Sequence, residues 1–512
     1  MAAQLLDIVL VGGLIAFSLL ILPKLLLLGA SPSLSNFPLN GGHHGIYPKR
    51  LMAFLFHAEQ LYKEGYAKFQ HAIYRMTTVD GERLVIPYSY LEELRQRPDD
   101  EINQPKALKL LLEAQYTHLE PDSPIINHVI RADLTHNLPR INLRISKEVD
   151  RCMETELPPC DDWTPVVINQ ALLRIVAIVS GSIFIGPEHC RKEEYLYSSI
   201  NFTVDVFSAV RALKRWPRFL RPIMQYFTPQ LRAIERHKTQ ARSFLEPIIK
   251  ERRAMMQHAQ SPSELPDDAL QWMLNKSPNF GMEGKDDEMA VMQLGLSMAA
   301  IHTTSQAATH TLFDIAANPK IIPELRKEIS TVLESTNGVM TTQALFQMKL
   351  LDSVMKESQR LNPPNMARFA RFVEKPVTLK DGTKLPAGVV VETPHIAITR
   401  DPKLFPNPNT FNPHRFANLR AGLSPDPIGY KNTEQYQFVT TTKENASFGY
   451  GRHACPGRFF AANEIKLIVA RLLLDYDIRL PDGVSERYRN IVVASVVNAD
   501  SSREVLLRKM RR

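Results

Sequence analysis

Cysteine is scarce in this chain of 512 residues, which contains only Cys152, Cys160, Cys190 and Cys455. Because thiols are so few and no two form a Cys-x-x-Cys pair, neither a disulfide framework nor a zinc site is expected. No Gly-x-Gly-x-x-Gly run follows a strand-like segment, so no nicotinamide or flavin domain is evident. Any redox chemistry would therefore depend on electrons from another protein.

Clusters of positive charge are also lacking, although Lys and Arg exceed Asp and Glu by 62 to 54. The basic residues are dispersed along helical patterns and are not grouped with aromatics, so no nucleic-acid partner is expected. The excess is most simply a solvated surface, and it would also suit an anionic membrane or an acidic redox partner. Hydrophobic residues make up 44% of the chain. With no repeat and no linker after residue 50, this composition indicates one large globular domain.

The N-terminus carries a long apolar run from Leu5 to Leu28. Residues 8–23 are uncharged and Lys24 can extend its amine to the interface, so the run is just long enough to span a bilayer. A cleaved signal peptide would begin with positive charge, which residues 1–6 lack. We therefore predict a transmembrane anchor over 1–28, a hinge over 29–49 and one domain over 50–512.

Positive charge follows the apolar run at Lys24, Lys49 and Arg50, which predicts a cytosolic position for the main domain. Asn-x-Ser/Thr acceptor sequences occur at Asn201, Asn275 and Asn445. A cytosolic domain would carry no glycan on any of them.

Most of the main domain has a helical pattern, so the expected fold class is mainly α with a small β region. Asp-Gly at residues 80–81 predicts a hairpin, and a second small β region is expected over 373–393. At 1.5 Å per residue, the helix expected over 286–317 would be about 48 Å long. Further helices are expected over 51–70, 91–276 with breaks, 323–333, 350–361 and 457–474.

One cysteine lies in a glycine-rich run just before the last of these helices. The run reads Phe-Gly-Tyr-Gly-Arg-His-Ala-Cys-Pro-Gly and covers residues 448–457. A helix beginning after Cys455 would direct its first N–H groups at the sulfur and favour the thiolate. Gly451 and Gly457 would allow tight turns close to a flat ligand. The alternative is a structural cysteine beside a turn.

Two further patterns accompany this loop. Glu357 and Arg360 lie three apart on one helix face, within reach of an ion pair, and Arg415 follows downstream. Two guanidiniums can hold one carboxylate through charge-assisted bonds and fix a neighbouring loop. The second pattern is the small-residue segment 299–305 of the long helix, where a hydroxyl could hold water and relay protons.

Together these motifs resemble the cytochrome P-450 monooxygenases of the microsomal type, most closely fungal members of secondary metabolism. The resemblance implies the P-450 fold over residues 50–512 and haem b with Cys455 as the thiolate ligand of its iron. It also assigns a Glu-Arg-Arg support to Glu357, Arg360 and Arg415, and an oxygen-activating role to Thr303. Cofactor contacts are implied for Phe448, Gly451, His453, Gly457 and, near a propionate, Arg368.

The sequence departs from the family pattern at two places. His302 stands where the family has an acidic residue before the threonine, so it either relays protons or is a satisfied core histidine. No Trp occurs near residues 127–150, where the family often holds a haem propionate. His136, Arg140 and Arg144 are the candidates that could replace it.

The resemblance implies insertion of one oxygen atom from O₂ into a lipophilic small molecule, with terpenoid or indole-terpenoid intermediates of fungal secondary metabolism as the expected class. Electrons would come from NADPH through NADPH–cytochrome P-450 reductase, with cytochrome b5 as an optional second donor. A single-pass location in the endoplasmic reticulum membrane would follow. The alternatives are a haem-thiolate isomerase or dehydratase that needs no O₂, and a non-enzymatic haem-binding membrane protein.

Overall fold

The structure, a computed structural model, describes residues 34–511. The anchor predicted over 1–28 lies outside the described residues. Within the described part of the chain, no helix combines the length and the apolar character that a membrane crossing requires.

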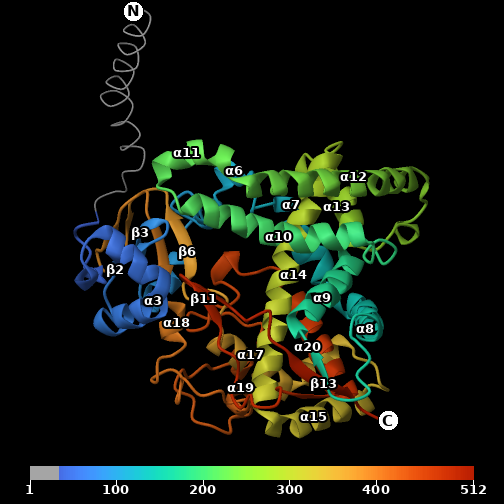
Figure 1. Ribbon diagram of the computed structural model, residues 1–512. Helices are drawn as coiled ribbons and strands as arrows, with labels where there is room; N and C mark the ends of the chain where they lie inside the picture. The colour runs from blue at the N-terminus through green and yellow to red at the C-terminus, as the bar shows by residue number, and fades with distance from the viewer. Residues whose placement is uncertain (1–33, 512) are drawn as a thin grey trace, which may run out of the picture.

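A long central helix, α14 (Asp286–Ala317), organises the molecule. In Figure 1 it runs from an upper layer formed by α10 (Glu193–Lys214) and α12 (Pro229–His258) down to α15 (Ile322–Ser335). Three acidic residues in its first turn favour the N-terminus, and Asn318-Pro319 follows its last residue. The helix predicted over 286–317 is therefore confirmed at both ends.

The α-helices have the following bounds: α3 Tyr47–Lys68, α4 Leu91–Leu94, α5 Gln104–Leu111, α6 Ala114–Thr117, α7 Pro124–His128, α8 Leu138–Thr155, α9 Ile168–Phe184, α11 Arg221–Met224, α13 Ala269–Lys276, α16 Thr342–Gln347, α17 Lys349–Leu361, α18 His395–Ile398, α19 Arg415–Ala421 and α20 Arg458–Asp475, besides the four already given. The strands are β1 Leu39–Asn40, β2 Tyr74–Thr78, β3 Gly81–Val85, β4 Ile102–Asn103, β5 Thr164–Val166, β6 Arg368–Val373, β7 Val377–Thr378, β8 Lys384–Leu385, β9 Val390–Thr393, β10 Tyr476–Arg479, β11 Ile491–Val493, β12 Val496–Asn498 and β13 Val505–Lys509. The fold is mainly α with a small β region, as predicted.

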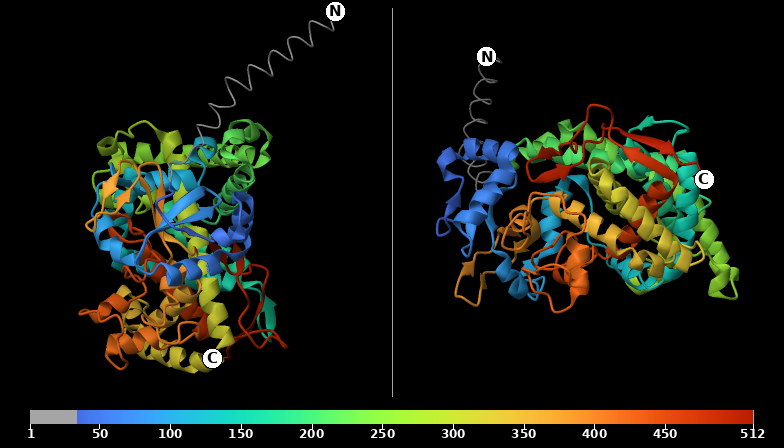
Figure 2. Two further views of the ribbon diagram at one scale, coloured as in Figure 1. Left: turned by 90° about the vertical axis from the view of Figure 1, so that its left-hand side faces the viewer. Right: turned by 90° about the horizontal axis from the view of Figure 1, so that it is seen from below.

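The largest sheet joins segments from distant parts of the sequence, in the order β1-β2-β3-β9-β6-β4. Figure 2 shows its blue and orange strands side by side at one flank of the helical body. The antiparallel pair β2–β3 is the hairpin predicted at Asp80-Gly81, where Gly81 has a φ of +98°. Strand β6 begins at Arg368, whose guanidinium lies close enough to Cys455 for the two charges to interact.

Residues 34–40 lie in the described part of the predicted hinge, and they are folded against the domain. Leu39 and Asn40 pair in parallel with Arg75 and Met76 of β2. Leu34 is buried in the cluster beneath the sheet. The chain is therefore folded against the domain from residue 34, because Leu34 buries apolar surface and β1 satisfies its backbone groups by joining an existing sheet edge.

Candidate haem site

The cysteine run forms a tight loop closed by its own backbone. The Cys455 N–H donates to the Phe448 carbonyl at 2.7 Å, and the Ala454 N–H donates to the Gly451 carbonyl at 3.0 Å. Gly449 and Gly451 adopt left-handed φ angles of +80° and +77°. A Cβ on Gly451 would also lie 2.8 Å from the Cβ of Arg95, so glycine is required there for space as well.

The tight turn that the sequence predicts at Gly457 does not require a glycine. Gly457 has a φ of −87°, which every residue type adopts, so no left-handed turn requires glycine there. The turning glycines are Gly449 and Gly451, and the spacing Gly-x-Gly at 449–451 is the signal that could have identified the first of them.

Cys455 is exposed and precedes α20, whose N-cap is Gly457. Protein atoms crowd the sulfur although the residue has accessible surface, and this burial raises the pKa of the thiol. The N–H groups of Gly457 and Arg458 and the guanidiniums of Arg458 and Arg368 oppose that rise. The helix N-terminus therefore favours the thiolate as the sequence predicted, and binding to a metal ion would complete the deprotonation.

Phe448 is half-buried and held by a neighbouring ring. Its ring lies 5.2 Å from that of Phe438 in an edge-to-face contact. The backbone N–H of Phe438 donates in turn to Asp352 of α17 at 2.8 Å. The loop that carries the cysteine is thus braced against the helix that carries Glu357.

The outer side of the loop is strongly basic. Arg452 and His453 both contact Asp99, at 2.7 and 2.8 Å from its Oδ1. Arg131 donates to the Arg452 carbonyl at 3.0 Å. A surface cavity of about 430 Å³ opens here, with Arg95, Arg131, Arg452 and Arg458 among its lining residues. His453, for which the resemblance implies a cofactor contact, thus bonds the acidic side chain of Asp99.

Arg368 is a half-buried cation at the start of β6. Its Nε has no hydrogen-bond partner, and burial lowers the pKa of the guanidinium to about 10, while the charge on Cys455 raises it. His395 lies close enough for Arg368 to lower its pKa, which burial chiefly sets at about 3. His395 contacts the Ser447 hydroxyl at 3.1 Å through Nε2, and its Nδ1 is also unpartnered. An anionic group here would satisfy Arg368 directly, and it would satisfy His395 by stabilising a proton on Nδ1, because Nε2 already bonds Ser447.

These residues fit the haem that the sequence led us to expect. Cys455 offers a thiolate to iron, and Arg368 and His395 would hold a propionate. The alternative candidates are engaged elsewhere: Arg144 bonds Asp267, as Arg140 does, and His136 contacts the Ala132 carbonyl at 3.0 Å. His395 was missed because nothing in the sequence around residue 395 indicates that β6 and β9 bring it to Arg368.

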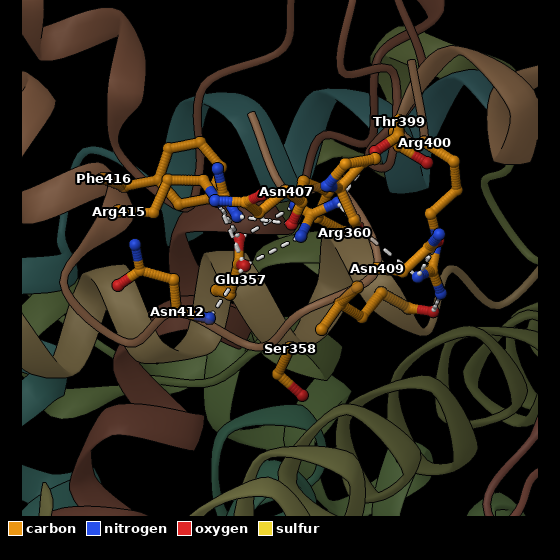
Figure 3. Close-up of polar contacts among 12 residues, drawn as sticks. Glu357, Ser358, Arg360, Thr399, Arg400, Asn407, Asn409, Asn412, Arg415 and Phe416 are labelled. Carbon is orange, nitrogen blue, oxygen red and sulfur yellow. Dashed lines mark hydrogen bonds and ion pairs between the residues drawn. The ribbon is translucent and has the colours of Figure 1, made fainter. Parts of the chain in front are cut away.

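The predicted Glu-Arg-Arg support is present and buried (Figure 3). Arg360 binds both carboxylate oxygens of Glu357 at 2.8 Å, and the Nε of Arg415 lies 3.0 Å from each of them. Asn412 adds a backbone N–H at 3.1 Å, and Arg360 also donates to the carbonyls of Thr399 and Pro408. The three charged side chains thus fasten α17 to the segments that precede the cysteine loop.

The oxygen-side helix presents an open face. Ala299 and Thr303, one turn apart on α14, are exposed although both neighbouring turns of the helix are largely buried. A Cβ added to Gly295, one turn earlier, would meet no atom within 4 Å. The Thr303 hydroxyl donates to the Ala299 carbonyl at 2.8 Å, which leaves its oxygen lone pairs toward the open side. His302 points elsewhere, with its Nε2 2.8 Å from the Ile200 carbonyl of α10.

A buried carboxyl group of α20 gives a testable pH dependence. Glu464 is fully buried and, among the described residues, bonds only the Ser180 hydroxyl, at 2.9 and 3.2 Å. Burial raises the pKa of Glu464 from 4.5 to about 8. Because the folded state then binds this proton more tightly than the unfolded state, the free energy of unfolding falls as the pH rises from about 4.5 to about 8.

Replacing Glu464 by Gln is expected to remove this fall in the free energy of unfolding at high pH. At pH 8 to 9 the variant should exceed the wild type in free energy of unfolding by roughly 3 to 5 kcal/mol, whereas below pH 4.5 the two should agree. Thermal unfolding across this pH range measures the difference. A wild-type advantage at pH 9 would show that Glu464 is ionised and stabilised in the folded protein.

The comparisons agree with this site. The sequence model of the family described as Cytochrome P450 matches residues 109–505. Cytochrome P450 monooxygenase braC of Annulohypoxylon truncatum is 38% identical over 94% of this chain and 94% of its own length. Cytochrome P450 monooxygenase paxP of Penicillium paxilli is 35% identical over 88% of this chain and 86% of its own. The structure of retinoic acid bound cyanobacterial CYP120A1 superposes with a TM-score of 0.65 at 18% identity, covering 94% of this chain and all of that one, which shows the same fold.

With a matching family model, relatives above 30% identity along nearly the whole chain, and a thiolate loop supported by a buried Glu-Arg-Arg cluster, this chain belongs to the cytochrome P450 family of haem-dependent monooxygenases.

Proposed function

We propose that this enzyme oxidises a terpenoid or indole-terpenoid intermediate of fungal secondary metabolism. The observation that carries the proposal is the open face of α14, where Gly295 and Ala299 leave room for a bulky apolar skeleton beside Thr303. Relatives at 35–38% identity, which come from fungi such as Penicillium paxilli and Penicillium crustosum, support a fungal context.

In the proposed reaction the haem and the protein residues have separate roles. Bound haem supplies the activation of O₂ and the oxygen atom that is inserted. Cys455 would bind the iron, while Arg368 and His395 would hold a propionate. The Thr303 hydroxyl would accept a hydrogen bond from a water molecule on the open side and so keep a proton source near the reacting oxygen. We assign no proton transfer to His302, whose Nε2 is directed at α10.

The basic cavity beside the cysteine loop is our candidate contact for the reductase. Arg95, Arg131, Arg452 and Arg458 line it, and an acidic partner docked there would approach the cofactor from the thiolate side. We propose NADPH–cytochrome P-450 reductase as this partner, with cytochrome b5 as a further donor. The proposed location is the endoplasmic reticulum membrane, with the domain in the cytosol.

An optical titration of membranes that contain the full chain tests the substrate class. We expect diterpenes or indole diterpenes to shift the Soret band to the high-spin form and to be oxidised when NADPH and reductase are present. Polyketides and simple alkaloids serve as controls. A normal reduced carbon monoxide spectrum without any shift from terpenoids would contradict the substrate class and leave the family unaffected.

The same membranes test partner and orientation. Raising the ionic strength should slow reduction by NADPH and reductase but not by dithionite, because only the former depends on charge pairing.

Glycosylation tests the orientation of the domain. Asn275 is exposed and is therefore the informative glycan acceptor, whereas Asn445 is buried. A glycan on Asn275 would place the domain in the lumen and overturn the proposed orientation.

A further inference from the structure

The residue that replaces the family's acid is bound to a backbone group of another helix. The Ile200 carbonyl can only accept, so the His302 Nε2 at 2.8 Å must carry the hydrogen. A helical carbonyl has a second lone pair, so Ile200 can accept this bond without losing its own helical one. Burial lowers the pKa of His302, which keeps the ring neutral in this contact.

A second polar contact between α10 and α14 indicates the role of the His302 hydrogen bond. Tyr195 of α10 lies 3.3 Å from the Ser297 hydroxyl of α14 through its own hydroxyl group. In each of these two contacts the α14 residue lies 102 positions after its α10 partner, so the contacts follow the same order along both helices. His302 therefore fixes the register of α10 on α14 at a point one residue before Thr303.

The direction of the His302 ring also determines where the Thr303 side chain points. Successive residues on an α-helix point about 100° apart, so a His302 side chain directed at α10 turns the Thr303 side chain away from that helix. Thr303 is exposed on the open face together with Ala299, whereas His302 is largely covered. The imidazole thus has no place on the open face from which to deliver a proton.

We propose that His302 is a positioning residue, whose Nε2–H bond to the Ile200 carbonyl holds α10 against α14 and thereby keeps the Thr303 side chain directed at the space on the open face of α14. The proposal deepens the proposed function, since that space is the one in which the substrate would lie. Protons for the reaction would then reach Thr303 from solvent and not from the imidazole.

Three substitutions separate positioning from proton relay. His302→Gln keeps an amide N–H donor near the Nε2 position but cannot titrate. His302→Asp restores an acidic group but, when ionised, cannot donate to a carbonyl. His302→Leu removes both properties. Thr311→Val is the matched control, because the Thr311 hydroxyl is buried on the same helix and bonds only the Ala307 carbonyl.

The first readout does not depend on turnover. We expect hydrogen–deuterium exchange of the α10 amides in the holoenzyme to be about tenfold faster in His302→Leu and His302→Asp, and unchanged in His302→Gln and Thr311→Val. The reduced carbon monoxide spectrum confirms that each variant retains thiolate-bound haem. Unchanged exchange in His302→Leu would overturn the proposal even if no terpenoid is ever found to be a substrate.

The second readout is coupling, the product formed per NADPH consumed, with any substrate that the titration identifies. Positioning predicts coupling within about twofold of wild type for His302→Gln and a loss of about tenfold for His302→Asp and His302→Leu. A relay predicts the opposite order, with Asp active and Gln as poor as Leu, and that order would refute the proposal. If the terpenoid proposal fails, a different substrate can be used without altering this comparison.

Discussion

Replacing Cys455 by Ala is expected to abolish monooxygenase activity and the thiolate-type spectrum of the reduced carbon monoxide complex. Cys455 is the only thiol in the loop that faces Arg368, and no other described cysteine is exposed. Loss of a metal ligand should reduce activity by more than the roughly 10- to 100-fold that removal of a residue supporting a ligand costs. The measurements are product formation with reductase and the optical spectrum.

Cys190→Ala provides the control for this experiment. Cys190 is buried, and burial raises the pKa of its thiol to about 11, so it cannot supply a thiolate near neutral pH. The control should keep the normal spectrum and turnover. Product formation by Cys455→Ala at the wild-type rate would mean that the chemistry does not need the thiolate, and the haem assignment would be withdrawn.

Replacing Glu357 by Ala is expected to prevent formation of stable holoprotein. The substitution would leave the buried guanidiniums of Arg360 and Arg415 without a counter-charge. Breaking a buried ion pair in this way costs about 3 to 5 kcal/mol, a large part of the stability of a typical domain. Haem content and thermal unfolding of the purified protein measure the effect.

Glu357→Gln keeps one acceptor oxygen and should give an intermediate loss, which can be measured if the alanine variant does not fold. Asp100→Ala is the matched control, because its ion pair with Lys375 is exposed and screened by water. The control should unfold at the wild-type temperature. Wild-type haem content and unfolding in both Glu357 variants would show that the cluster does not support the cysteine loop.

Local sequence signals were sufficient for several elements. Helix α14 could be predicted to the residue because acidic side chains at its start and Asn318-Pro319 after its end are local signals. The β2–β3 hairpin could be predicted because Asp-Gly at 80–81 supplies the positive φ that the turn needs. The Glu357–Arg360 pair could be predicted because a spacing of three places both side chains on one helix face.

The sequence by itself therefore determined the mainly helical fold class, the candidate thiolate loop and the Glu357–Arg360 pair, because each depends on residue types at short and fixed spacing. The place of Arg415 in the cluster, 58 residues from Glu357, was implied only by the family resemblance. Only the tertiary structure decided what His302 contacts, that Arg368 lies near His395 with one nitrogen of each unpartnered among the described residues, and that residues 34–40 belong to the domain. Those facts depend on contacts between segments about 30 to 100 residues apart, which the packing of helices and the pairing of strands create and which no local pattern encodes.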